Sequence, residues 1–145
     1  MRIGVIGGGA WGTALAQVAS RGGEVLLWAR EEEVVAGINA RHENAAFLPG
    51  LPLSAAIRAT GRLDDLADMD ALLVVAPAQH VGQVLAETPV GTTPLVLCAK
   101  GIEAGSRRLV GEVAKAVHPA APIAVLSGPT FAHEVARGMP TAVTL

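Results

Sequence analysis

The sequence contains little of what several kinds of specialised site require. Its one cysteine, Cys98, allows neither an internal disulfide nor a thiolate metal cluster, and this favours a reducing, cytoplasmic setting. Tyrosine is absent and aromatic residues make up 3% of the chain, which argues against stacking platforms for nucleic acid bases. A net charge of −2 provides no positive field for nucleic acid or an anionic membrane. No apolar run approaches the roughly 18 residues of a membrane span.

Hydrophobic residues make up 51% of the 145-residue chain, enough for the core of one domain. Short apolar runs alternate with longer amphipathic ones, and strands that are apolar on both faces are typical of a parallel sheet covered by helices. We therefore expect one α/β domain over residues 1–145, a doubly wound, mainly parallel sheet with helices on both faces. The expected strands are 2–6, 24–29, 56–59, 71–76, 95–99, 123–126 and 141–145, the last of open direction; the expected helices are 11–20, 31–42, 63–67, 79–87, 106–117 and 131–137.

A glycine-rich turn follows the first expected strand. Gly7, Gly9 and Gly12 satisfy the pattern G-x-G-x-x-G, with Ala10 and Trp11 between the last two. The pattern gains meaning because it leaves a strand and opens a helix, where Gly7 allows the tight turn and Gly9 the approach of a pyrophosphate. Gly12 allows close packing of helix on strand. We interpret the turn as a Rossmann-like dinucleotide site rather than a plain strand–helix connection.

The residues after the second strand bear on the choice between NAD and NADP. An acidic residue about 20 positions beyond the glycines commonly binds the ribose 2′-hydroxyl of NAD. Arg30 stands there, and its guanidinium could hold the 2′-phosphate of NADP or stack on adenine. Glu31 follows and could be the ribose acid instead, or the two could form a surface pair. NADP is favoured over NAD.

Ligands of such sheets bind beyond the carboxyl ends of the strands. His80 follows the fourth strand and is expected to border the cofactor. Lys100 follows the fifth, where its ammonium could bind an anionic or carbonyl substrate, the alternative being a solvated lysine. The segment Gly128 to Thr130 turns into a helix whose amides could bind a second anion.

The remaining candidate residues receive structural interpretations. The four histidines show no metal-ligand spacing, so no metal site is expected. His42, His118 and His133 are interpreted as surface residues, and Cys98 as a small buried hydrophobe.

Several motifs together resemble the N-terminal half of NAD(P)-dependent glycerol-3-phosphate dehydrogenase, over essentially the whole chain. The glycine turn alone fits many dehydrogenases, whereas the motifs at 99–103 and 127–136 are specific. The resemblance rests on residues 7–16 (GGGAWGTALA), 27–30 (LWAR), 39–44 (NARHEN), 47–50 (FLPG), 99–103 (AKGIE), 127–136 (SGPTFAHEVA), Gly138 and 140–142 (PTA).

The resemblance implies reduction of dihydroxyacetone phosphate by NAD(P)H to glycerol 3-phosphate, the backbone precursor of phospholipids. In that family the matching positions divide into two groups. Those that touch the dinucleotide match Ala10, Trp11, Arg30, Lys100, Ala132 and, in some members, His80. Those that touch the phosphorylated substrate match Lys100, Gly128 and Thr130.

The family's proton-transfer lysine belongs to a helical C-terminal domain, and no residue here matches it. The resemblance therefore implies a cofactor-binding domain that is inactive alone, part of a larger enzyme that could be a homo-oligomer. Two alternatives stay open: a related NADP-dependent enzyme such as ketopantoate reductase or a β-hydroxyacid dehydrogenase, and a stand-alone dinucleotide-sensing module. The first resembles this chain only around the glycine turn.

Overall fold

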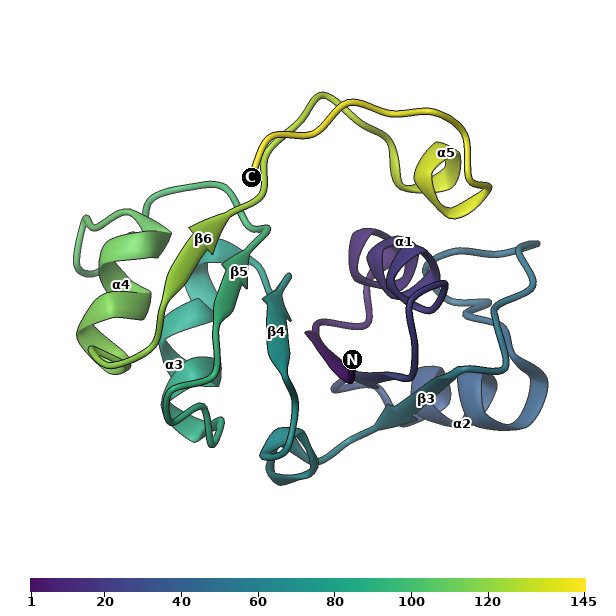
Figure 1. Ribbon diagram of the computed structural model, residues 1–145, viewed down its shortest axis with the longest axis horizontal. Helices are drawn as coiled ribbons and strands as arrows, with labels where there is room; N and C mark the ends of the chain where they lie inside the picture. Colours follow the sequence, from purple (N-terminus) through teal and green to yellow (C-terminus); the bar gives the residue numbers. More distant parts are fainter.

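One parallel sheet forms the centre of the computed structural model, which describes residues 1–145 (Figure 1). Its six strands lie in the order β3-β2-β1-β4-β5-β6, and every neighbouring pair is parallel. The winding direction reverses between β1 and β4, which confirms the predicted doubly wound α/β fold. The strands are β1 (Ile3–Ile6), β2 (Val25–Trp28), β3 (Ile57–Thr60), β4 (Ala71–Val74), β5 (Leu95–Leu97) and β6 (Ile123–Val125).

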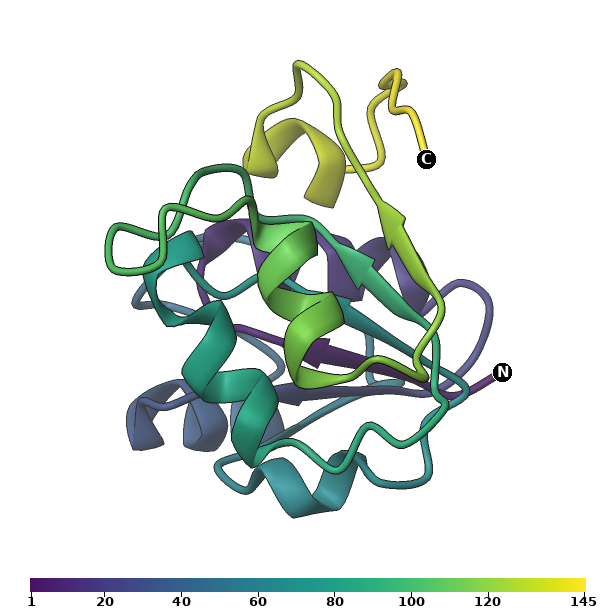
Figure 2. The ribbon, with the colours of Figure 1, turned by 90° about the vertical axis from the view of Figure 1, so that its left-hand side faces the viewer.

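Helices cover both faces of the sheet. One face carries α1 (Ala10–Ala19), α2 (Glu32–Arg41) and α5 (Ala132–Ala136), and α5 packs beside α1. The other carries α3 (Val81–Glu87) and α4 (Val110–Val117), which lie side by side in Figure 2, with the 3₁₀ turns η1 (Leu63–Leu66) and η2 (Ala78–His80) nearby. No helix has the length and apolar character to cross a membrane.

Side chains along each strand point alternately to the two faces of the sheet, and this alternation explains the two layers of helices. In β1 the side chains of Val5 and Ile6 are both fully buried, yet they join different cores. Val5 packs with Leu27 of β2 and with α1 and α2, while Ile6 packs with Leu72 and with α3 and α4. Because successive side chains point to opposite faces, a strand that is apolar throughout needs a helix on each side.

Most of the expected elements begin and end within two residues of their predicted bounds, but two differ more from the structure. Residues 141–145 do not form a strand: the segment makes a single antiparallel bridge, in which Ser127 and Thr144 exchange two backbone hydrogen bonds of 2.9 and 2.7 Å. That bridge lies beyond the end of β6, where no neighbouring strand continues the ladder. The helix expected from residue 106 begins at Val110, because Arg107 adopts a left-handed φ of 58° that ends helical continuity.

Candidate functional site

The glycine-rich turn connects β1 to α1, and most of its glycines are required by close packing. Gly7 has a φ of 130°, a conformation that side chains rarely adopt. A Cβ at Gly12 would collide with the carbonyl oxygen of Gly7, and one at Gly8 would lie 2.5 Å from the Cβ of Ala29. Gly9 differs, since no atom lies within 4 Å of its position for a Cβ. The space beside Gly9 opens into the pocket described next.

The start of α1 offers unpaired backbone donors. The amides of Gly9, Ala10 and Trp11 donate no hydrogen bond within the protein, and the first bond of this turn runs from the amide of Thr13 to the Gly9 carbonyl. Gly9 is the N-cap residue and contributes no side-chain oxygen that would satisfy these amides. Unpaired amides at the positive end of a ten-residue helix form a site for an anion.

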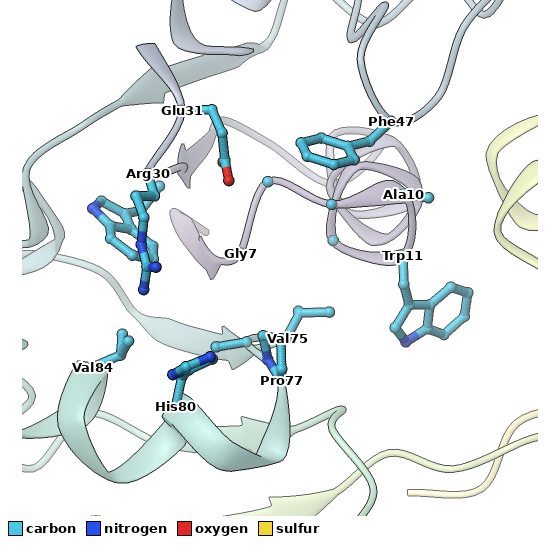
Figure 3. Close-up of a pocket in the computed structure, with 15 residues that line it drawn as sticks. Gly7, Ala10, Trp11, Arg30, Glu31, Phe47, Val75, Pro77, His80 and Val84 are labelled. Carbon is cyan, nitrogen blue, oxygen red and sulfur yellow. The ribbon is translucent and has the colours of Figure 1, made fainter. Parts of the chain in front are cut away.

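A cavity of about 460 Å³ lies in front of these amides, at the point where the sheet reverses direction. Figure 3 shows Arg30, Glu31 and Phe47 on one side of the glycine turn and Val75, Pro77 and His80 on the other. The volume of the cavity falls within the range typical of small-molecule sites. The cavity unites seven of the predicted cofactor residues: Gly7, Gly9, Ala10, Trp11, Gly12, Arg30 and His80.

Both residues considered for the ribose end of a dinucleotide line this cavity. Arg30 and Glu31 are exposed and follow the end of β2. They form no ion pair with each other, since the only ion pairs join Arg41 to Glu43 and Arg62 to two aspartates. Trp28 lines the same end and is fixed by a hydrogen bond from its Nε1 to the carbonyl of Gly61, 3.2 Å away. One cation and one anion therefore face the same region of the cavity.

A second, smaller cavity of about 290 Å³ unites the predicted substrate residues Lys100, Gly128 and Thr130. Lys100 is exposed and forms no ion pair, so its ammonium is available to a ligand. Trp11 lines both cavities and thus marks where they meet. Lys100 is placed with the substrate group and does not line the larger cavity.

Gly128 is required by the backbone that passes over it. A Cβ at this position would lie 2.6 Å from the carbonyl oxygen of Ala142 and 3.1 Å from the Cα of Val143. The adjacent bridge between Ser127 and Thr144 holds this segment in place, and Val143 lines the smaller cavity. The segment expected to be a strand thus forms part of the wall of this cavity.

Burial sets the chemical state of Cys98, which lies one residue beyond the end of β5 rather than inside a strand. The residue is 6% exposed at the inner wall of the smaller cavity. Desolvation raises the pKa of its thiol to about 11. The burial confirms the interpretation of Cys98 as a small buried hydrophobe, and a thiol that stays protonated is a poor nucleophile.

Other predicted residues lie elsewhere. Ala132 lines neither cavity and instead packs against the core of the α1 face. His133 is exposed, as expected, but the interpretation of His42 and His118 as surface residues is wrong. Both are half-buried; His42 ends α2 in a left-handed conformation, and Nε2 of His118 lies 2.7 Å from the Leu85 carbonyl oxygen, joining α4 to α3.

Sequence reasoning missed several residues that line the larger cavity. Val75 and Pro77 follow β4 at the reversal point, but the fourth strand is expected to run to residue 76, and beyond it only His80 is assigned to the cofactor. Phe47 comes from the loop between α2 and β3, and no periodicity or strand end marks it. Only its appearance in a family motif indicated that it mattered.

Comparison with known proteins agrees with this site. The family model described as the N-terminus of NAD-dependent glycerol-3-phosphate dehydrogenase matches residues 2–145. A glycerol-3-phosphate dehydrogenase [NAD(P)+] of Erythrobacter litoralis is 60% identical over 144 residues, and one of Sphingopyxis alaskensis is 58% identical. Both alignments cover 99% of this chain and 44% of the relative, so this chain spans less than half the length of these relatives.

A solved structure shows the same architecture. The crystal structure of glycerol-3-phosphate dehydrogenase from Coxiella burnetii superimposes with a TM-score of 0.89 at 35% identity. The superposition covers 98% of this chain and 45% of the other. The structure of the enzyme from Plasmodium falciparum gives a TM-score of 0.86 at 25% identity. These matches confirm the resemblance to glycerol-3-phosphate dehydrogenase that the sequence motifs indicated, and they favour it over the ketopantoate reductase alternative.

Proposed function

The chain belongs to the family of NAD-dependent glycerol-3-phosphate dehydrogenase N-termini, and from this membership and the geometry we propose that it binds NAD or NADP for the reduction of dihydroxyacetone phosphate to glycerol 3-phosphate. The observation that carries the proposal is the set of unpaired amides from Gly9 to Trp11, which faces a cavity at the sheet's reversal point. We place this chemistry in the cytoplasm, because a reducing compartment keeps a single cysteine such as Cys98 as a free thiol.

A dinucleotide fits the larger cavity because open space and unpaired hydrogen-bond donors lie side by side at the glycine turn. The open position beside Gly9 admits a pyrophosphate close to the backbone, and the three amides supply its hydrogen bonds. The cavity then extends in two directions. One end is bordered by Trp28 and Arg30, which suit an adenosine, and the other reaches Trp11, where the smaller cavity begins.

The proposal favours NADP over NAD at the adenosine end. Arg30 has no carboxylate partner, so its guanidinium is free to form two hydrogen bonds with a 2′-phosphate. Glu31 lies beside it and could accept a hydrogen bond from the 2′-hydroxyl of NAD. We therefore expect both dinucleotides to bind, with NADPH the tighter, because the cation is the group free to pair with the added phosphate.

The smaller cavity is assigned to the phosphorylated substrate. The Lys100 ammonium holds negative charge on the substrate, and the Thr130 hydroxyl adds a hydrogen-bond donor. Trp11 lines both cavities, so a substrate here lies next to a dinucleotide bound along the glycine turn. When bound, the reduced nicotinamide supplies the hydride.

Proton transfer is assigned to none of these 145 residues. The smaller cavity contains one basic side chain, Lys100, which this proposal uses to position the substrate, and one thiol, which burial keeps protonated. We assign the acid of the reduction to a separate helical domain, within the part of the relatives that this chain does not cover. The 145 residues then form the dinucleotide domain and one wall of the substrate site.

Titration of the 145-residue chain with NADPH and NADH tests the proposal. Both tryptophans of the chain, Trp11 and Trp28, line the larger cavity, so binding is expected to quench their fluorescence. Isothermal titration under the same conditions gives the stoichiometry, expected to be one dinucleotide per chain. Absence of binding for both dinucleotides would contradict the proposed function.

A second measurement tests the assignment of proton transfer. The chain is incubated with NADPH and dihydroxyacetone phosphate, and absorbance of the reduced nicotinamide is followed over time. We expect no oxidation above the rate without protein. Steady turnover by the 145 residues alone would show that they contain the proton donor and would overturn that part of the proposal.

A further inference from the structure

A buried asparagine from a distant loop is hydrogen-bonded to the glycine turn. Asn44 is 1% exposed and lies in the connection between α2 and β3. Its Nδ2 donates to the carbonyl oxygen of Gly8 and to Oγ1 of Thr13, each at 2.8 Å. Its Oδ1 accepts a hydrogen bond of 3.2 Å from the amide of Phe47. Both amide hydrogens and the carbonyl oxygen of this side chain are therefore paired.

The bond to Gly8 determines where the next amide points. In a trans peptide the carbonyl and the following N–H point in opposite directions, and the chain contains no cis peptide. With its carbonyl held toward Asn44 in the interior, the Gly8–Gly9 peptide directs the Gly9 amide away from Asn44, toward the cavity. Thr13 acts in the same way on the next peptide, since its Oγ1 donates to the Gly9 carbonyl at 2.8 Å.

The bond from Phe47 connects this network to the opposite wall. Phe47 lines the larger cavity across from Val75 and His80 and is 41% exposed (Figure 3). Its loop is joined to Asn44 by two bonds, from the Phe47 amide to Oδ1 and from the Leu48 amide to the Asn44 carbonyl at 2.9 Å. One buried side chain thus fixes both the phosphate-facing turn and an aromatic wall.

We propose that Asn44 is a positioning residue, which with Thr13 holds the glycine turn and Phe47 in the arrangement that receives the dinucleotide. Neither Asn44 nor Thr13 lines the larger or the smaller cavity, and both are buried, so their effect on a ligand passes through the groups they hold. The inference rests on the proposed dinucleotide function. An amide held in place before binding does not lose conformational freedom when the ligand arrives, so the network raises affinity.

The test compares dinucleotide affinity in neutral variants of the 145-residue chain. Asn44→Ala removes all three side-chain hydrogen bonds without adding charge near the phosphates. Thr13→Val replaces the hydroxyl with a methyl group, whereas Thr13→Ser retains the hydroxyl. We expect the Kd for NADPH to rise about tenfold or more in Asn44→Ala and in Thr13→Val, and to stay within about twofold of wild type in Thr13→Ser.

Asn39 supplies the matched control. Its side chain also pairs with backbone, since Nδ2 donates to the Ala59 carbonyl and Oδ1 accepts from the Ala59 amide, both at 2.9 Å. These bonds join α2 to β3 outside the cavities. Asn39→Ala is therefore expected to lower the melting temperature while leaving the Kd unchanged, measured well below the melting transition of each variant.

The outcomes separate this inference from the proposed function. Wild-type Kd values in Asn44→Ala and Thr13→Val, or an equal loss in Asn39→Ala, would overturn the positioning role while dinucleotide binding stands. Should Asn44→Ala fail to fold, the Thr13→Val and Thr13→Ser pair decides, because an equal Kd in those two overturns the inference. Failure of the wild-type chain itself to bind overturns the proposed function and this inference with it.

Discussion

Replacing Gly9 by alanine separates the requirements of the ligand from those of the fold. Gly9 has a φ of −71° and a ψ of −177°, which any residue adopts, and no atom lies within 4 Å of the added Cβ. At the N-cap of α1, alanine costs about 0.5–1 kcal/mol relative to glycine. The reduced freedom of the unfolded chain offsets about 0.4–1 kcal/mol of that cost. The net change in the free energy of unfolding is therefore small, and we expect the melting temperature to shift by less than about 3 °C.

The effect of Gly9→Ala on binding should be much larger. The added methyl projects into the space that a pyrophosphate needs in order to reach the amides of Gly9, Ala10 and Trp11. Loss of a single hydrogen bond to a charged group costs about 1.5–3 kcal/mol. That range corresponds to a rise in the Kd for NADPH of about 10- to 150-fold. Fluorescence titration of Trp11 and Trp28 measures it directly.

Two other glycines provide the controls for this experiment. Gly105 also has no atom within 4 Å of the position that a Cβ would take, and it lines neither cavity, so Gly105→Ala should leave the Kd unchanged. Because it reduces the freedom of the unfolded chain, it should raise the free energy of unfolding by about 0.4–1 kcal/mol. Gly12→Ala forces a methyl against the Gly7 carbonyl oxygen, an overpacking that costs about 1–3 kcal/mol and lowers the melting temperature. A Gly9→Ala chain that binds NADPH with the wild-type Kd would refute the reasoning.

Three further substitutions or measurements test other parts of the structure. Arg30→Asp should reduce the preference for NADPH over NADH by about tenfold or more in competitive titrations, and an unchanged ratio would exclude Arg30 as the 2′-phosphate ligand. Ile38→Ala removes a fully buried side chain and should lower the urea-unfolding free energy by about 2–5 kcal/mol. Because burial raises the pKa of Cys98 to about 11, iodoacetamide at pH 8 should label the folded chain far more slowly than the urea-unfolded chain, and equal rates would contradict its burial.

The fold could be predicted because its strands carry an unusually direct signal. Residues 71–76 and 95–99 are apolar without interruption, and a short run of this kind between helices is typical of a strand buried on both faces. The structure trims these runs by two residues each, to Ala71–Val74 and Leu95–Leu97. Parallel order follows from the intervening helices, since right-handed crossovers allow few other arrangements.

The errors occur where a tertiary contact or a single backbone angle decides the structure. Residues 141–145 have the composition of a strand, but a strand needs a partner, and only Ser127 offers one. The helix expected from residue 106 starts four residues late, because Arg107 takes a left-handed conformation within a turn closed by Glu103 and Arg108. Neither the missing partner nor the sign of one φ can be read from local composition.

The residues of the candidate site also fall into two groups, those that the sequence pattern predicts and those that only tertiary contacts place. Residues that follow strands in sequence, such as Arg30, His80 and Lys100, could be predicted, because the topology of the sheet brings strand ends together. Asn44 and Phe47 could not be predicted from spacing. They reach the glycine turn through a loop with no regular structure, and only the folded chain shows that Asn44 hydrogen-bonds to Gly8.

The glycine pattern itself combines two kinds of information that the sequence alone cannot separate. Gly7 and Gly12 are required by the turn and by the approach of α1 to β1, and Gly8, at a position the pattern leaves free, is required by contact with Ala29. These glycines would persist in a domain of this fold that bound nothing. Of these glycines, only Gly9 is required neither by packing nor by its φ, so its presence is better explained by a ligand that approaches the backbone there. A glycine there is evidence for function, whereas its neighbours are evidence for the fold.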